Sequence, residues 1–348
     1  MSDVEAVQQQ PLAFTEAAFP AGELDFLGNT LCALRGTFRS AFGEWVQEYN
    51  AKGGAALNSY LPEKCNGGEY ADVWQAEAIA DFPAVVSGFG FGNFFRRSFL
   101  EGLAAGGHFQ SVALEGPAGV AAQPFVDPQQ DFTIYGLYPY VLMVDRTKLG
   151  ALPVPSSWSD LLRPEYTDQI IAVGSSNKIS ELLLLTLYKK FGDDGIIRLA
   201  ANIKDGWHGR VMVKTVEAPE SNTEGAGIYV IPWIFAQQCK DSDHVSIIWP
   251  EDGALVNPLF LLTRKSKPSA VQAVTEFITS KSFAEQATAQ HFVMLNSGVD
   301  PGLPEGATFN WLGWDFIRGN DLEQLKAHVQ EVFQENWKYA GLKNSGGC

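Results

Sequence analysis

Two cysteines are placed where their thiols could meet. Cys32 follows the first predicted strand and Cys65 follows the second, and both strands belong to one predicted parallel sheet. Since the carboxyl ends of parallel strands face the same edge of a sheet, the thiols could form a disulfide or share a soft metal ion such as copper or zinc. The alternative is that each side chain packs as a small hydrophobe. Cys239 and Cys348 are expected to have structural or incidental roles.

A candidate anion site precedes an apolar helical run over residues 179–187. There Ser175, Ser176 and Asn177 carry small hydroxyl and amide groups, which at a helix start lie beside unpaired backbone N–H groups. Such a helix N-terminus can bind an anion. Plain helix capping explains the same residues equally well, so both interpretations stay open.

The Gly-rich segment Gly88–Asn93 follows another predicted strand. It fails as a dinucleotide fingerprint, because its sixth position is Asn93 and the bulky Phe91 stands where a pyrophosphate must approach the backbone. We therefore predict a tight turn that lines a cleft. The ligand contacts predicted at this strand end and at the end of the first strand are Asn29, Thr30, Cys32, Ser87 and Gly88.

Several aromatic side chains fall in predicted loops or chain crossings rather than on one helix face. Some of them must belong to the core, but tyrosine oxygens at a lobe boundary can also bind a ligand or a hard cation. The ligand contacts predicted from this group are Tyr138, Tyr140, Tyr229 and Trp233. The candidate metal ligands are Cys32, Cys65 and Tyr229.

The usual motifs of catalysis are absent from the sequence. It contains no HExxH, CxxC, GxSxG or GxxxxGK[ST] motif. Its five histidines are scattered, and none has the local spacing of metal ligands. We therefore predict a binding protein that does no chemistry, with no resident cofactor.

The charge balance excludes two classes of partner. The chain has 348 residues and a net charge of −15, with a calculated pI of about 4.8. Binding to nucleic acid or to an anionic membrane requires clustered Lys and Arg, so neither is expected. The sequence also has no apolar run of the roughly 18 residues that a membrane-spanning helix needs.

Strands alternate with helices along most of the chain, which predicts a mostly parallel sheet covered on both faces. Strands are expected at residues 23–30, 55–61 and 82–87, with a helix through Phe38 and Trp45. A long β-rich run, Phe132–Arg146, contains Pro139, and a proline in a central strand predicts a bend or a change of strand partner. The α/β pattern restarts near residue 140 and ends near 257.

This order predicts two α/β lobes joined by two hinge crossings around a central cleft. The expected parts are a mobile arm at 1–21, lobe 1 at 22–138 plus 258–285, lobe 2 at 139–257, C-terminal helices packing on the lobes at 286–340 and a disordered tail at 341–348. A monomer is expected. The first residues lack the positive charge and apolar segment of an export signal, so the chain as written predicts a cytoplasmic protein, or a periplasmic one if an upstream leader has been removed.

One segment resembles a known family. The string Leu152–Tyr166 (LPVPSSWSDLLRPEY) is similar to the PxxWxDLxxPxY stretch of solute-binding proteins of ABC importers, in the iron(III)-type branch of the type II periplasmic binding fold. Further segments resemble a subgroup of that branch assigned to metal binding. They are Gly88–Phe95, Gly227–Phe235, Trp249–Ala254 and Trp311–Phe316.

The resemblance implies a receptor that closes two lobes on a small ligand, such as a metal ion, a metal complex or an oxyanion, and delivers it to an ABC permease. Iron is the metal that the branch suggests. Iron(III)-binding relatives use a consecutive Tyr pair with a His and a carboxylate, whereas the corresponding region here has Tyr229 and then Pro232-Trp233. The alternatives are a cytoplasmic enzyme or a ligand sensor on the same two-lobed fold.

Overall fold

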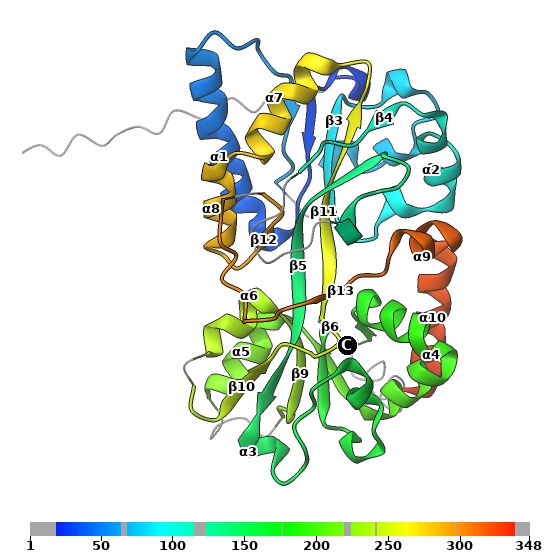
Figure 1. Ribbon diagram of the computed structural model, residues 1–348. Helices are drawn as coiled ribbons and strands as arrows, with labels where there is room; N and C mark the ends of the chain where they lie inside the picture. Colours follow the sequence, from blue (N-terminus) through cyan, green and yellow to red (C-terminus); the bar gives the residue numbers. More distant parts are fainter. Residues whose placement is uncertain are drawn as a thin grey trace, which may run out of the picture.

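Two long antiparallel strands, β5 (Phe132–Asp145) and β11 (Ala254–Arg264), run through the molecule and join its two lobes (Figure 1). Tyr138 pairs with Asn257 where the strands pass from one lobe to the other. The lobe boundaries expected at 138/139 and 257/258 therefore fall in the middle of β5 and β11. This computed structural model describes residues 19–63, 68–114, 123–175, 177–218, 224–240, 242–296 and 298–337.

Lobe 1, the upper lobe of Figure 1, is built on the strand order β2-β1-β3-β11-β5. β1 pairs in parallel with β2 and β3, as the alternation of strands and helices predicts. Phe38 of α1 packs edge-on against Phe277 of α7 and Phe283 of α8, which joins these three helices. The other elements of this lobe are β1 (Phe26–Gly28), α1 (Cys32–Ala51), β2 (Ser59–Tyr60), β3 (Val85–Phe89), α2 (Arg97–Glu101), β4 (Phe109–Gln110), α7 (Pro268–Ile278), α8 (Lys281–Thr288) and β12 (Val293–Met294).

Lobe 2 continues the sheet through β5-β9-β6. β6 pairs in parallel with β8 and β9. A second hydrophobic core cluster lies in this lobe and includes Met143, Ile171 and Tyr229. Its elements are α3 (Arg146–Leu149), β6 (Ile170–Ser175), β7 (Lys178–Ile179), α4 (Glu181–Asn202), β8 (Ile203–Trp207), α5 (Gly209–Glu217), β9 (Ile228–Pro232), α6 (Trp233–Ala236) and β10 (Val245–Ile248).

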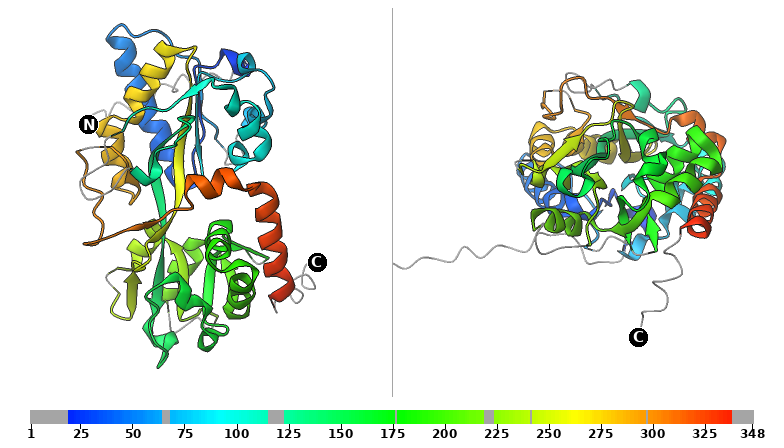
Figure 2. Two further views of the ribbon diagram at one scale, coloured as in Figure 1. Left: turned by 45° about the vertical axis from the view of Figure 1, so that its right-hand side comes forward. Right: turned by 90° about the horizontal axis from the view of Figure 1, so that it is seen from below.

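The C-terminal segment crosses between the lobes once more, through β13 (Phe309–Asn310), α9 (Trp314–Gly319) and α10 (Leu322–Asn336). α9 lies on lobe 1, where the Trp314 indole donates to the Phe125 carbonyl at 3.2 Å. α10 lies along α4 of lobe 2, where the Gln330 amide donates to the Ile179 carbonyl at 2.9 Å (Figure 2). The corner between α9 and α10 is therefore a third connection between the lobes.

The predicted change of partner at Pro139 is confirmed. Up to Tyr140, β5 pairs with β11, and at residues 136–137 it also pairs with β12. Beyond Pro139, β5 pairs with β9 from Tyr140 and with β10 from Leu142. Pro139 itself stands opposite Val256. A proline, which cannot donate to a sheet ladder, thus lies where one set of partners replaces the other.

Candidate functional site

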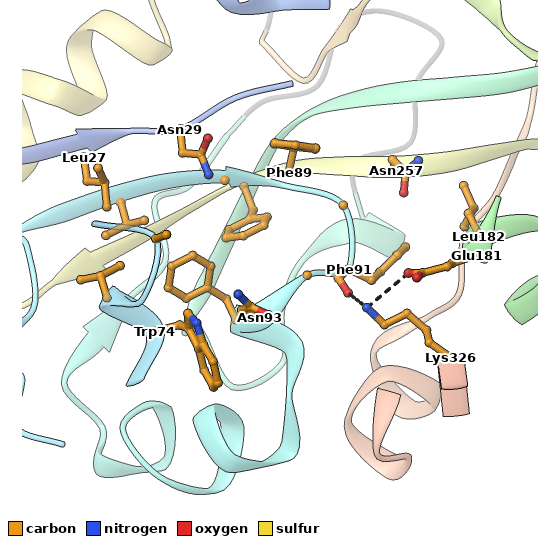
Figure 3. Close-up of a pocket in the computed structure, with 18 of the residues that line it drawn as sticks. Leu27, Asn29, Trp74, Phe89, Phe91, Asn93, Glu181, Leu182, Asn257 and Lys326 are labelled. Carbon is orange, nitrogen blue, oxygen red and sulfur yellow. Dashed lines mark hydrogen bonds and ion pairs between the residues drawn. The ribbon is translucent and has the colours of Figure 1, made fainter. Parts of the chain in front are cut away.

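A cavity of about 520 Å³ lies between the lobes. Lobe 1 contributes the ends of β1 and β3, the Gly-rich turn after β3 and the segment around Trp74. Lobe 2 contributes Tyr140 and the start of α4, and β11 contributes Asn257 at the crossing. Lys326 of α10 completes the lining (Figure 3). Because its walls come from both lobes and from a crossing strand, any movement of the lobes changes this cavity.

The Gly-rich segment forms the turn that the sequence predicts. Gly90 has φ +62°, a left-handed conformation that favours glycine, and its N–H donates to the Pro258 carbonyl at 2.8 Å. A Cβ added at Gly90 would lie 3.5 Å from Asn257 Oδ1. The turn is therefore anchored to the crossing strand and leaves its glycine face open to the cavity.

Four partly exposed aromatic rings line the lobe 1 side of the cavity: Tyr70, Trp74, Phe89 and Phe94. Behind them, the Arg96 guanidinium lies 4.3 Å from the centre of the Trp74 ring and pairs with Glu323 at 3.0 Å. This wall offers flat apolar surface to a ligand.

The lobe 2 side is polar. Burial raises the pKa of Tyr140 to about 12, and the neighbouring Ser180 and Asn257 side chains act in the opposite direction. Tyr140 is therefore a neutral hydroxyl at physiological pH. It can donate or accept a hydrogen bond.

One ion pair lines the cavity. The Lys326 ammonium donates to the Phe91 carbonyl of lobe 1 at 2.7 Å and pairs with the Glu181 carboxylate of lobe 2 at 3.4 Å (Figure 3). Only 19% of the lysine side chain is exposed. These contacts link the Gly-rich turn, α4 and α10.

Three of the predicted ligand contacts line the cavity, namely Asn29, Gly88 and Tyr140. Ser87 and Thr30 lie buried just behind the wall. The Ser87 hydroxyl donates to the Asn29 carbonyl at 2.8 Å and lies 3.3 Å from the Tyr135 hydroxyl. Ser87 therefore fixes the backbone that carries Asn29 and does not face a ligand.

Tyr138 is placed outside the lining. Its ring stacks on Phe292 at 5.4 Å and meets the Tyr140 ring edge-on at 5.7 Å. Burial raises the pKa of its hydroxyl above the usual value for tyrosine. It supports Tyr140 from the side of the core.

The predicted helix start at Ser175–Asn177 is wrong. β6 extends to Ser175 and turns into the short strand β7, with Ser175 and Asn177 exposed in the hairpin, while Ser176 lies outside the described residues. α4 is capped by Ser180, whose hydroxyl accepts from the Leu183 N–H at 3.5 Å. The helix start therefore lies at Ser180 rather than at Ser175–Asn177, and this start lines the cavity.

The predictions for Tyr229 and Trp233 are also wrong. Tyr229 is completely buried in the lobe 2 core, where its hydroxyl accepts from the Ala226 N–H at 3.0 Å. Burial raises the pKa of this hydroxyl to about 12. Trp233 is 6% exposed and packs edge-on against Trp249. Both side chains are core residues: Tyr229 lies in β9, which is buried along its whole length, and Trp233 is the first residue of α6, directly after it.

Two of the three candidate metal ligands, Cys32 and Tyr229, lie in different lobes. Cys32 lies at the exposed start of α1 in lobe 1 and is disulfide-bonded, so it offers no thiolate. Tyr229 lies in the core of lobe 2, and Cys65 lies outside the described residues. In the described part of the chain, no group of three His, Cys, Asp or Glu side chains could hold a metal ion.

The sequence reasoning missed part of the lining. Asn257 interrupts the apolar run of β11 just before Pro258. A polar residue in such a run is a sequence signal that could have identified Asn257 as a lining residue. Tyr70 and Trp74 belong to two short 3-10 turns, Gly68–Tyr70 and Val73–Gln75. Glu181 and Lys326 lie 145 residues apart in the sequence (326 − 181 = 145), so no local sequence pattern pairs them.

Residues 80–320 match the family model described as bacterial extracellular solute-binding protein. The chain belongs to this family. The resemblance to solute-binding proteins of ABC import is thereby confirmed, and the chain is a non-enzymatic receptor. No curated protein matches the chain.

Solved structures of solute-binding proteins have the same type II periplasmic binding fold. They include an apo ferric-ion-binding protein of Pasteurella haemolytica (16% identity, TM-score 0.61, covering 90% of this chain and 98% of the other). A Trichodesmium protein in complex with iron and citrate has 14% identity and a TM-score of 0.63, covering 90% of this chain and 99% of the other. A periplasmic binding protein of Actinobacillus pleuropneumoniae with bound fructose-6-phosphate has 14% identity and a TM-score of 0.58, covering 90% and 98%.

None of the helices in the described ranges is both long and apolar enough to cross a lipid bilayer. The disulfide at Cys32 is of a kind that persists in oxidising compartments, in agreement with the extracellular description of the family.

Proposed function

We propose that this solute-binding protein captures a small ligand in the cavity between its lobes and delivers it to the permease of an ABC importer. The observation that carries the proposal is that both lobes and the crossing strand β11 line one cavity. A ligand that touches both lobes binds the closed arrangement better than the open one. It therefore shifts the population toward closure.

The two sides of the cavity would make different kinds of contact with a ligand. The aromatic rings of lobe 1 give apolar contact, while Tyr140 and Asn257 give hydrogen bonds near the crossing, where the lobes move least. Closure would remove water from these groups and strengthen each polar contact. The permease would recognise the closed form.

The ligand classes expected from the sequence make different demands on this lining. A bare metal ion needs several ionised ligands, and the described residues hold no group of three. An oxyanion or an anionic metal complex would rely on Lys326 and on backbone N–H groups of the Gly-rich turn. Metal ions, metal complexes and oxyanions are therefore all tested as ligands.

Small-angle X-ray scattering and thermal unfolding test the proposal on the full chain. The test ligands are ferric chloride, ferric citrate, inorganic phosphate, fructose-6-phosphate and uncharged heterocycles. A true ligand is expected to reduce the radius of gyration and, at about ten times its Kd, to raise the Tm by about 2 °C. If every test ligand leaves both quantities unchanged, the proposed receptor function is contradicted.

A pair of glycine variants locates the site. Gly90→Val places a side chain toward Asn257 in the cavity and should weaken binding at least tenfold. Gly53→Val is the control, because Gly53 also has a positive φ (+83°) but lies after α1 with open space around it. Both variants carry similar backbone strain, of about 1 kcal/mol. Equal loss of binding in both would mean that strain, not the cavity, is responsible.

A further inference from the structure

The charged side chains of the cavity neutralise each other. In the described lining Glu181 is the one acidic side chain and Lys326 the one basic side chain, and they pair at 3.4 Å. The lysine also donates to the Phe91 carbonyl. Arg96 behind the aromatic wall is likewise paired, with Glu323. A ligand with a net charge would have to break one of these pairs or remain uncompensated in a closed site, and both are unfavourable.

Polar recognition instead falls to three side-chain amides. Asn29 follows β1, Asn93 follows the Gly-rich turn and Asn257 lies at the crossing, and all three are partly exposed in the cavity (Figure 3). Among the described residues, the side chains of Asn29 and Asn93 have no hydrogen-bond partner. Each amide carries two donors and an acceptor, so together they suit a ligand that has both donors and acceptors.

The apolar part of the lining is flat. Tyr70, Trp74, Phe89 and Phe94 all keep part of their surface exposed, and aromatic rings pair best with other π-systems in offset or edge-on arrangements. A cavity of about 520 Å³ lies within the range of roughly 300–1,000 Å³ that small organic ligands occupy. The aromatic wall and the amides line the same cavity.

We propose that the ligand is a small planar heterocycle without net charge, held between the aromatic wall and the three asparagine amides. This inference rests on the proposed receptor function and names the class of its solute. Its ring would lie against Trp74 and Phe89, and its polar edge would pair with Asn29, Asn93 and Asn257. The Glu181–Lys326 pair would stay intact in the complex.

Nicotinamide and nicotinate test the role of charge, because they share a ring and a size and differ in an amide or a carboxylate. Binding is measured by isothermal titration and thermal unfolding at neutral pH, with uracil and orotate as a second pair. The neutral member of each pair should bind at least tenfold more tightly than the anion. An anion that binds as well as its neutral partner would overturn the proposal, and so would the failure of both neutral probes to bind at about 10 mM.

A charge variant makes the test specific to this cavity. Glu181→Gln leaves Lys326 without its carboxylate and should shift the nicotinate-to-nicotinamide affinity ratio about tenfold toward nicotinate. Glu335→Gln makes the same change on an exposed face of α10, outside the lining, and should leave the ratio unchanged. Equal ratios in the two variants would contradict the charge argument.

The two proposals can fail separately. If ferric citrate, phosphate or fructose-6-phosphate compacts the protein in scattering while the neutral heterocycles do not, the receptor function stands and the uncharged heterocycle is wrong. If none of these compounds compacts the protein, the receptor function itself is contradicted.

Discussion

Burial sets the protonation state of Tyr140, a residue that lines the cavity. Its pKa is raised to about 12 because the ionised phenolate would lose its hydration between the lobes. The folded protein therefore holds the phenolic proton more tightly than the unfolded chain, in which the tyrosine pKa is about 10. Tyr140 acts as a neutral hydroxyl over the whole physiological range.

This shift predicts a loss of stability at alkaline pH. A group whose pKa is raised by folding contributes stability that is complete below the unfolded pKa and is lost as the pH rises from about 10 to about 12. Replacing Tyr140 by Phe removes this contribution. Between pH 9 and pH 11 the free energy of unfolding, measured with denaturant, should fall in both proteins. The fall in Tyr140→Phe should be smaller than the fall in the parent by about 1 kcal/mol. Parallel curves for the two proteins would show that Tyr140 ionises alike in both states.

Tyr229 shows why residue type alone does not locate the site. Its pKa is also raised to about 12 by burial, yet it lies in the core of lobe 2 rather than in the cavity. All five residues of β9 are buried, so the alternation that separates inner from outer faces is missing from its sequence. Tyr140 lines the cavity because it lies beside a crossing, a property of the chain order.

The elements were more predictable than the side chains, because strands and turns follow local rules. Pro139 predicted the exchange of strand partners in β5, and the glycines after β3 predicted the turn that lines the cavity. The start of α4 was misplaced because Ser175 and Ser180 are both acceptable helix caps. Only the pairing of β7 with β6, a contact between two segments, selects Ser180.

α9 is held on lobe 1 by a buried cluster of charges. Arg318 pairs with Asp127 at 2.6 Å and with Asp131 at 3.1 Å, and the Asp127 side chain is fully buried. Burial raises the pKa of Asp131, against the attraction of Arg318. The arginine thus compensates two carboxylates that have little access to water.

Removing this arginine should destabilise the protein. Arg318→Leu leaves Asp127 buried without a counter-charge, which costs about 3–5 kcal/mol of unfolding free energy in urea. Arg97→Leu is the matched control, because Arg97 pairs with Glu101 on an exposed helix face and such pairs contribute less than about 1 kcal/mol. A loss below 1 kcal/mol in Arg318→Leu would show that the two carboxylates are stabilised without it.

At the scale of the whole molecule, three connections join the lobes. β5 and β11 cross side by side, whereas the α9–α10 corner crosses at another place on the molecule (Figure 2). α10 lies along α4 of lobe 2, but its Lys326 reaches the Phe91 carbonyl of lobe 1. This contact and the Arg96–Glu323 pair bind the lobes to each other on the side of the C-terminal helices.

Lys326 should therefore set how far the lobes stand apart before any ligand binds. Lys326→Met removes its hydrogen bond to the Phe91 carbonyl and its ion pair with Glu181. A partly exposed charge-assisted contact contributes about 1 kcal/mol, which is about a fivefold change in the ratio of open to closed molecules. The ligand-free variant should thus have a larger radius of gyration in small-angle scattering than the parent.

The matched control for this prediction is Lys281→Met. It makes the same substitution at a lysine that is 70% exposed and pairs with Glu285 within α8 of lobe 1, away from the crossing. Its radius of gyration should equal that of the parent. Because salt weakens exposed ion pairs, raising the ionic strength should expand the parent, and it should also expand Lys326→Met, which keeps the partly exposed Arg96–Glu323 pair between the lobes. Equal radii in the two variants at low salt would mean that the strands alone hold the lobes in place.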